Sequence, residues 1–337
     1  MNAVQPLVSV LLPTYNRAAF LEAALDAIRT QTWTAWELIV VDDGSTDATA
    51  SVIESAKAVT RQPILYVKQD NAGAYGARNT ALDHASGKYV AFYDSDDLWL
   101  PHHLRDCVEA LEANPDIDWV YGSCRSVDYE TGRTIAPDTF RAEGRERPFM
   151  KHVAEVRGKL HVLATQGLFE CALLSGLYAG LQNSVMKRTL FDGVRFEAEL
   201  RNEAEDQLFV ARGIKRGYRF AFLDNVHVQY HVHGSNSSGS ASGMTLERWQ
   251  RLLDPVARGF ERLRQDFQLT SAETRALRRR LHREYFWHQG YSVFLANGRY
   301  SEAVTVLRRG LREWPWSARA WKSYVVARLR MLSGARA

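Results

Sequence analysis

The first hundred residues alternate between short apolar runs and longer stretches with helical periodicity. The apolar runs, which predict buried strands, are residues 7–12, 37–41, 64–67 and 89–93. Between them, segments such as 18–31 and 48–59 place apolar residues three and four positions apart, as amphipathic helices do. Continuous apolar strands joined by helices are typical of a parallel sheet covered on both faces. The pattern predicts an α/β domain with a Rossmann-like, mostly parallel central sheet flanked by helices.

Beyond residue 115 the pattern is less regular, and near the C-terminus it becomes helical. Further strands are predicted at 118–129, at 183–188 (leading into a helix), at 220–223 and over the extended segment 226–236. Residues 137–173 show no regular pattern. From 246 to about 332 the periodicity is helical throughout, with a weak resemblance to a tetratricopeptide-like helix pair that would pack on the α/β domain. We therefore predict two parts, an α/β domain over 1–240 and an all-α region over 245–337.

Acidic residues come directly after the predicted strands. They would therefore lie at the edge of the sheet that the carboxyl ends of the strands form. Asp94, Asp96 and Asp97 come directly after the strand at 89–93, and ligands of open α/β sheets bind at this edge. Asp94 and Asp96 would point the same way along a strand, and their like charges need a cation between them. Such oxygen ligands suit Mg²⁺ or Mn²⁺. The alternative, an acidic turn that caps the next helix near Pro101, is equally open for Asp97.

Composition and motifs exclude several classes of protein. The chain has 337 residues, of which 46% are hydrophobic and 24% charged, as in ordinary globular proteins. It lacks a Gly-x-Gly-x-x-Gly sequence after the first strand and a Gly-Lys-Ser/Thr loop, which disfavours dinucleotide-binding dehydrogenases and P-loop NTPases. Cys107, Cys124 and Cys171 are odd in number and lack metal-type spacing, which favours buried thiols in a reducing compartment. No secretory signal and no membrane span are predicted, so we expect a cytoplasmic location.

The net charge of +4 hides an asymmetry along the chain. Residues from 245 onward hold 19 Lys and Arg against 8 Asp and Glu, while the rest holds 24 against 31. Trp314, Trp316 and Trp321 lie among the basic residues of this tail. Such an aromatic and basic surface is suited to an anionic membrane leaflet. The open alternative is that these aromatic residues pack the tail helices together. No nucleic-acid partner is expected, because no recognised binding motif accompanies the charge.

Four short motifs occur in order at the ends of the predicted strands or in the helix before the fourth one. They are Pro13-Thr14-Tyr15-Asn16-Arg17, Asp42-Asp43-Gly44-Ser45-Thr46-Asp47, Ala77-Arg78-Asn79 and Asp94-Ser95-Asp96-Asp97. Together they resemble the successive motifs of family 2 glycosyltransferases. The resemblance implies a GT-A fold in the α/β domain and inverting transfer of a sugar from a nucleotide-diphosphate donor, with Mn²⁺ or Mg²⁺ as cofactor.

The resemblance also implies roles for individual residues. Thr14 and Tyr15 would line the base pocket, and Asp43 would accept a hydrogen bond from a ring N–H of the base. Arg78 would lie near the diphosphate, Asp94 would touch the ribose or the sugar, and Asp96 would bind the metal. The full set of expected donor-binding residues is Pro13, Thr14, Tyr15, Arg17, Asp43, Asn71, Arg78, Asp94, Ser95 and Asp96. Taken singly, Tyr15 and Asn16 would only shape a turn, and Arg78 would only pair with a carboxylate.

A second group of acidic residues precedes a helix near residue 206. Glu205-Asp206 resembles the family's Glu-Asp motif, which implies that Asp206 is the catalytic base. Inverting transfer needs one carboxylate to take the proton of the acceptor hydroxyl, and a helix N-terminus favours its ionised form. Glu203 and Glu205 are weaker candidates, and an ordinary acidic first turn is the alternative.

The segment 226–236 carries His227, His231 and His233, which would project from one face of an extended strand. Three interpretations stay open, namely a three-histidine zinc site, solvent-exposed side chains, and His233 as a donor-site residue. The last follows from the family's Tyr-Arg-x-His-x-x-Ser ending, where His233 matches a position that helps to bind metal or diphosphate. His231 replaces the usual arginine, which puts a phosphate contact there in doubt. Residues 235–243 are expected to form either a loop over the donor or a linker.

The leading hypothesis is a glycosyltransferase that uses a UDP-linked sugar and a glycan, lipid-linked or protein acceptor in bacterial surface-polysaccharide synthesis. It would be cytoplasmic, with peripheral attachment to the inner face of the membrane. The alternative is a membrane-peripheral assembly protein with a vestigial site. The presence of Asp43, Asp96 and Asp206 together argues against it. A nucleotidyltransferase would show a glycine-rich, basic loop after the first strand, which residues 13–17 do not form.

Overall fold

The structure is a computed structural model that describes residues 5–197, 205–233 and 246–333. Its central element is a mixed sheet in the order β10-β11-β13-β6-β12-β4-β1-β2-β3, with β5 paired to β13 and β7 paired to β6. These strands are β1 (Val8–Thr14), β2 (Trp36–Asp42), β3 (Ile64–Lys68), β4 (Tyr89–Phe92), β5 (Leu98–Trp99), β6 (Trp119–Asp128), β7 (Thr134–Ala136), β10 (Val153–Arg157), β11 (Leu160–Leu163), β12 (Ser184–Lys187) and β13 (Phe220–Val232). The short strands β8 (Arg141–Ala142) and β9 (Arg145–Glu146) pair separately.

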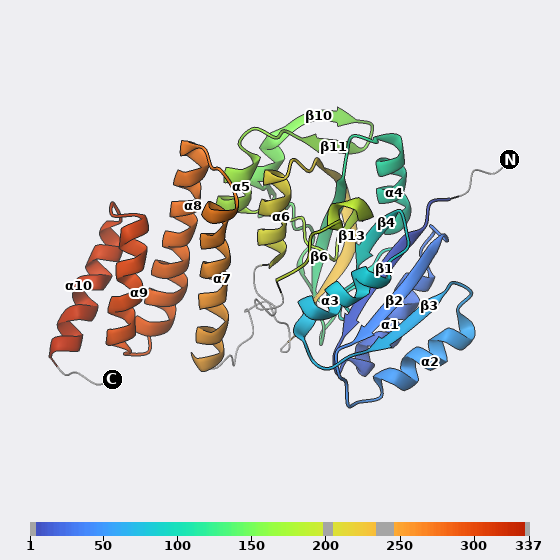
Figure 1. The fold of residues 1–337 in the computed structure, drawn as a ribbon, viewed down its shortest axis with the longest axis horizontal. Coiled ribbons are helices and arrows are strands. Elements are labelled where there is room, and N and C mark those ends of the chain that lie inside the picture. The colour runs from blue at the N-terminus through green and yellow to red at the C-terminus, as the bar shows by residue number, and fades with distance from the viewer. Residues whose placement is uncertain (1–4, 198–204, 234–245, 334–337) are drawn as a thin grey trace.

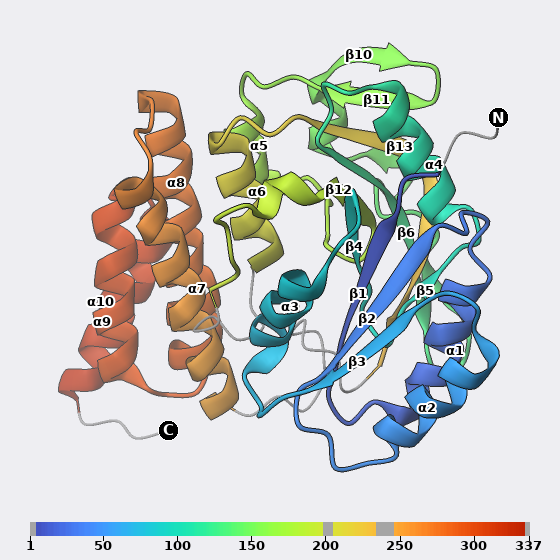
Figure 2. The ribbon, with the colours of Figure 1, turned by 45° about the vertical axis from the view of Figure 1, so that its right-hand side comes forward.

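The N-terminal half of the sheet is parallel, as the sequence predicts. β1 pairs in parallel with both β2 and β4, and β2 pairs in parallel with β3. The helices α1 (Ala18–Arg29), α2 (Thr49–Val59) and α4 (His103–Ala113) share a buried cluster with one face of the sheet. The helix α3 (Gly73–His84) packs in the cluster on the other face. Figures 1 and 2 show α1 and α2 lying across the sheet from α3.

The second half of the α/β domain departs from the pattern in three places. β12 lies antiparallel between β4 and β6, and it leads into a 3-10 turn, η2 (Arg188–Phe191), where the sequence predicted a helix. The stretch predicted to be irregular holds the 3-10 turn η1 (Pro148–His152), the β10–β11 hairpin and α5 (Leu168–Ser175). The two predicted strands after residue 219 form one strand, β13, with register shifts between Leu223 and Val228.

The C-terminal region is helical, as predicted. It comprises α7 (Leu246–Asp266), α8 (Ser271–Arg283), the π-helical segment η4 (Glu284–Leu295), α9 (Tyr300–Glu313) and α10 (Ala318–Leu332). These helices pack beside α5 and α6 (Glu205–Lys215), and one hydrophobic cluster contains side chains from both parts of the chain (Figure 1). No helix in the described ranges is long and apolar enough to span a membrane. The predicted boundary at 240–245 lies outside the described residues, so the exact division stays a prediction.

Candidate active site

The parallel pairing brings the first three predicted loops to one edge of the sheet. Thr14, the last residue of β1, lies opposite Asp42, the last residue of β2. The backbone N–H of Asp43 then donates to the Thr14 carbonyl at 2.9 Å. Because all these strands run the same way, the polar residues that follow them meet at their carboxyl ends.

Asp43 holds the loop that begins α3. One carboxylate oxygen accepts hydrogen bonds from Gln69 Nε2 at 2.7 Å and from the Ala72 N–H at 2.8 Å, and the other accepts from the Gly73 N–H at 2.8 Å. Asn71 donates to the Asp43 carbonyl at 3.0 Å. The sequence did not identify Gln69, whose only signal is its place beside Asn71 in a polar loop. The second carboxylate oxygen keeps accepting capacity for a further N–H.

In the first motif, Asn16 has a structural role, whereas the side chains of Thr14 and Tyr15 make no such contacts in the described part of the chain. Asn16 has a positive φ of 50°, and its side-chain oxygen accepts from the Thr46 N–H at 2.9 Å, so it shapes the turn and joins the first two motifs. Tyr15 is 49% exposed. The hydroxyl of Thr14 is buried without a hydrogen-bond partner among the described residues. Tyr15 is thus accessible to a ligand, whereas the Thr14 hydroxyl is buried at the end of β1.

Arg78 connects the third motif to two carboxylates. This buried guanidinium on α3 lies 2.8 Å from Asp94 Oδ1. Burial lowers the pKa of Arg78, but the Asp94 and Asp206 carboxylates outweigh it and raise that pKa. Burial raises the pKa of Asp206, the Arg78 guanidinium opposes that rise, and the Asp94 charge adds to it. The structure therefore brings together the predicted base and two predicted donor-binding residues.

Asp206 lies in the first turn of α6, as the sequence predicts, and its Oδ2 faces the Leu181 N–H at 3.4 Å. Glu203 lies outside the described residues, as does the side chain of Glu205.

Asp96 lies beside a histidine and an arginine from two separate segments of the chain. Its Oδ2 lies 3.1 Å from His233 Nε2 and 3.8 Å from an Arg17 nitrogen. The strand β4 ends at Phe92, so the strand alternation used to align Asp94 with Asp96 does not apply to them. They lie in a turn instead, and each faces a different cation, which resolves the repulsion between their like charges.

Asp97 takes neither of the roles considered for it. It does not cap the next helix, because β5 follows it and α4 begins at His103. Its buried carboxylate accepts the His231 N–H at 3.1 Å, and burial raises its pKa well above the usual range, with the Asp94 and Asp96 charges adding to the rise. Nδ1 of His231 lies 2.8 Å from the Asp96 carbonyl, to which it donates. Asp97 and His231 therefore connect the end of β13 to the turn at residues 94–97, called the acidic turn below.

A zinc site shared by His227, His231 and His233, one of the three interpretations of the sequence, does not agree with the structure. His231 and His233 contact the acidic turn, whereas His227 faces His103 on α4. Four residues of extended strand span about 13 Å, which is too far for His227 to share an ion with His231.

The edge of the sheet that carries Asp94, Asp96 and His233, called the donor edge below, fits a divalent cation that also binds a ligand. Among the described residues, Asp96 and His233 are adjacent, and no third side chain converges on them closely enough to complete a set of metal ligands. A carboxylate and an imidazole, with the other positions filled by phosphate oxygens and water, suit Mn²⁺ or Mg²⁺. Phe20 stacks on the His233 ring, with 5.2 Å between centroids.

Comparison with known proteins agrees with this arrangement. Residues 9–169 match the family model for glycosyl transferase family 2, and residues 287–327 match a tetratricopeptide repeat model. Over 134 residues the chain is 36% identical to the Escherichia coli UDP-Glc:alpha-D-GlcNAc-diphosphoundecaprenol beta-1,3-glucosyltransferase WfgD. That match covers 39% of this chain and 51% of WfgD, so the chain matches only about half the length of this relative.

Two solved structures share the fold over nearly the whole chain. Residues 1–349 of S. aureus TarS in complex with UDP-GlcNAc superpose with a TM-score of 0.62 at 19% identity, covering 96% of this chain and 87% of TarS. The Pyrobaculum calidifontis mannosyltransferase PcManGT in complex with GDP-Man and Mn²⁺ gives 0.56 at 20% identity, covering 99% and 82%. The sheet and its acidic edge define a GT-A domain. Within it, residues 9–169, a little under half of the chain, are similar to glycosyl transferase family 2.

Proposed function

We propose that this protein is a metal-dependent, inverting glycosyltransferase that moves a sugar from a UDP-linked donor to an acceptor hydroxyl in bacterial surface-polysaccharide synthesis. The observation that carries the proposal is the meeting of Arg78, Asp94 and Asp206 beside Asp96 at one edge of the sheet. WfgD, by its name, uses UDP-Glc and a lipid-linked acceptor. That supports UDP here and an acceptor that is a glycan, a lipid-linked sugar or a protein.

The donor would lie along the edge from β2 to β4. Thr14, Tyr15, Asp43 and Asn71 would hold the base, and a ring N–H would take the remaining accepting capacity of the Asp43 carboxylate. Arg78 would face the diphosphate and Asp94 the ribose or sugar. The expected pocket is completed by Pro13, Arg17 and Ser95.

Asp96 and His233 would hold Mn²⁺ or Mg²⁺. A bound divalent cation neutralises negative charge on a leaving diphosphate. Asp206 would accept the proton of the acceptor hydroxyl as that oxygen attacks the anomeric carbon. The Arg78 guanidinium favours the ionised form of Asp206 that this role requires.

We also propose that the tail attaches the enzyme to the inner face of the cytoplasmic membrane, where lipid-linked acceptors are found. Support comes from the exposed side chains of α10 and the residues before it, which include Trp316, Trp321 and Leu329, with basic residues between them.

The test is UDP release from UDP-glucose, UDP-galactose and their N-acetyl forms, with Mn²⁺ and then with a chelator. We expect slow, metal-dependent hydrolysis that falls by about 100-fold or more in Asp96→Ala. Glu109→Gln, which changes an exposed carboxylate on α4, should keep the wild-type rate.

If every UDP-sugar is silent, thermal shifts with UDP, GDP and dTDP separate a different nucleotide from a site that binds none. Binding of GDP or dTDP alone would overturn the choice of UDP. The absence of binding to all three would overturn the enzyme and favour the assembly protein with a vestigial site.

A further inference from the structure

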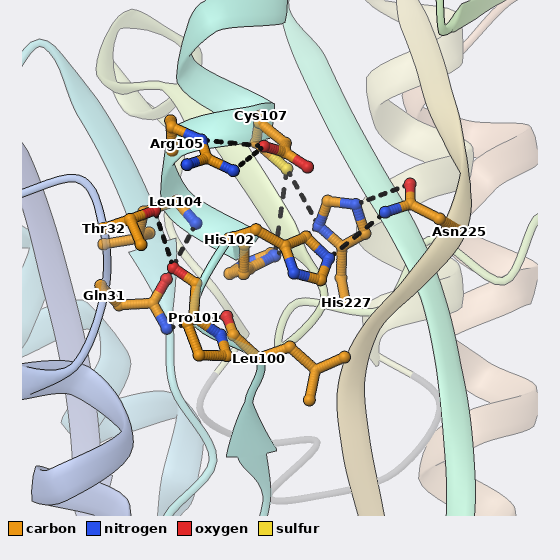
Figure 3. A network of polar contacts seen from close by, with 12 residues as sticks. Gln31, Thr32, Leu100, Pro101, His102, Leu104, Arg105, Cys107, Asn225 and His227 are labelled. Atoms are coloured by element: carbon orange, nitrogen blue, oxygen red, sulfur yellow. Dashed lines mark hydrogen bonds and ion pairs between the residues drawn. The ribbon is translucent and has the colours of Figure 1, made fainter.

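We propose that His103, Cys107 and His227 form a structural zinc site, distinct from the donor site. All three side chains are buried, and their ligand atoms lie within 4.8 Å of one another. His103 and Cys107 are one turn apart on α4, which places them on the same face of the helix. His227 reaches them from β13, and Figure 3 shows Cys107 and His227 turned toward each other.

The distances match the edges of a tetrahedral zinc site. The two Nδ1 atoms of His103 and His227 are 3.1 Å apart. Cys107 Sγ lies 3.9 Å from the first and 3.8 Å from the second. Zinc bonds of about 2.0–2.1 Å to nitrogen and about 2.3 Å to sulfur give edges of about 3.3 Å and about 3.6 Å in a tetrahedron. An ion at the centre would therefore need shifts of only a few tenths of an ångström.

The chemistry of His227 is that of a metal ligand. Its Nε2 lies 3.0 Å from Asn225 Oδ1, which only accepts, so the proton is assigned to Nε2 and the Nδ1 lone pair faces His103 and Cys107. A ligating histidine ordinarily has such an acceptor for its second nitrogen.

The neighbouring strand β6 leaves space for the His227 imidazole because it has a glycine at the point of contact. The His227 ring packs against Gly122 on β6, where a Cβ atom would come within 2.2 Å of the ring. His102 and Asp106 form a separate group with His227, so the fourth position around an ion held by His103, Cys107 and His227 would be filled by water. On binding, the Cys107 thiol would release its proton to solvent, and the ion would take one thiolate and two neutral imidazoles.

Zinc here would join α4 to β13, four residues before His231. Because His231 and His233 hold the acidic turn, the ion would fix the strand that supports the donor edge. The role is structural, since the three ligands are buried and lie outside the set of donor-binding residues.

The test is to strip the full chain with a chelator and titrate it with Co²⁺. We expect one ion per chain to give a thiolate-to-cobalt charge-transfer band and the intense visible bands of a four-coordinate ion, both displaced by Zn²⁺. A second ion, at Asp96 and His233, would give no thiolate band. Wild-type protein that binds no Co²⁺ and no Zn²⁺, or that binds Co²⁺ without a thiolate band, would overturn the proposal whatever the variants do.

Variants assign the site. Cys107→Ser should lose the thiolate band and the rise in unfolding temperature that Zn²⁺ gives the wild type. Cys171→Ser, at another buried free cysteine, should keep both. Asp96→Ala should also keep both, because it alters only the donor edge. A band that survives in Cys107→Ser or disappears in Asp96→Ala would place the ion elsewhere. If Cys107→Ser does not fold, His227→Gln replaces it, since a thiolate–cobalt spectrum unchanged by that substitution would contradict the site.

Discussion

At the scale of single residues, the charge of the proposed base depends on two neighbours with opposite effects. Burial and the Asp94 carboxylate raise the pKa of Asp206, and the Arg78 guanidinium lowers it. A general base works only when it is ionised, so activity should rise with pH through the pKa of Asp206. Because that pKa lies above the ordinary value for aspartate, the acidic limb should lie at a higher pH than an exposed aspartate would give.

Substitutions at these neighbours should move the acidic limb in opposite directions. Asp94→Asn removes a charge that raises the pKa of Asp206 and frees Arg78 to face it, so the limb should shift to lower pH. Arg78→Gln removes the opposing cation, so the limb should shift to higher pH. Asp206→Asn should lower kcat by about 10²–10⁴-fold and abolish the limb. The measurement is kcat/KM against pH on the residual activity of each variant.

Glu109→Gln provides the control, since its pH profile should match that of the wild type. Shifts of Asp94→Asn and Arg78→Gln in the same direction would show that another group titrates in the acidic limb.

At the scale of elements, the arginine-rich run at residues 275–283 of α8 makes hydrogen bonds to the α/β domain that its sequence does not predict. Arg280 and Arg283 donate to the carbonyls of Leu173 and Leu174 in the last turn of α5. Carbonyls at a helix C-terminus lack partners within their own helix, and positive charge is favourable there. This part of the run therefore joins the helical region to the α/β domain and is not a solvated basic surface.

Arg280→Met should destabilise the protein far more than the loss of a surface charge. Arg280 is buried, pairs with the buried Glu284 at 2.7 Å and donates to Gln207 at 2.7 Å. Removing one partner of a buried pair leaves an uncompensated charge, so the free energy of unfolding should fall by about 3–5 kcal/mol. Arg275→Met, at an exposed position of the same helix, should change it by about 0.5 kcal/mol or less.

Denaturant unfolding followed by circular dichroism measures both variants. A loss below about 1 kcal/mol for Arg280→Met would mean that Glu284 is solvated or protonated once the arginine is gone.

The sequence predicted best those strands that are almost wholly buried, because such strands consist of continuous apolar runs. Every residue of β4 is buried, and so is nearly every residue of β1 and β2, so their apolar runs are continuous. In β10, at the edge of the sheet, the three central residues are exposed, and no apolar pattern marks it. In β13 the exposed pair Asp224 and Asn225 falls where the register shifts, which made one strand look like two.

The same reasoning explains how much of the candidate site the sequence contained. It indicated which residues gather at the donor edge, because parallel strands end at a common edge. It missed contacts between segments far apart in the chain. His103 and His227 are separated by 124 positions, and Asp97 and His231 by 134. Cys107 follows His103 by one helical turn, but only the fold brings His227 to this pair.

At the scale of the whole molecule, the helical region extends from the α/β domain and ends in α10, which lies farthest from the sheet (Figure 1). Its aromatic residues do not all pack between helices, as one interpretation of the sequence required. Trp316 is 84% exposed and Leu329 is 62% exposed, and the basic residues Lys322 and Arg328 are exposed beside them. Apolar side chains among cations are suited to a surface that carries negative charge.

Full-length protein should therefore bind vesicles that contain phosphatidylglycerol, bind neutral phosphatidylcholine vesicles weakly, and be released by salt. Each basic residue near such a surface contributes about 1 kcal/mol, so Lys322→Glu with Arg328→Glu should weaken binding by about 30-fold or more. The matched control is Arg61→Glu with Lys159→Glu, which makes the same charge change at exposed positions of the α/β domain. Vesicle co-sedimentation measures both pairs. Equal losses would show attraction by net charge alone, and unchanged binding in the tail variant would remove α10 from the membrane contact. A loss confined to the tail variant would place the membrane at the end of the helical region.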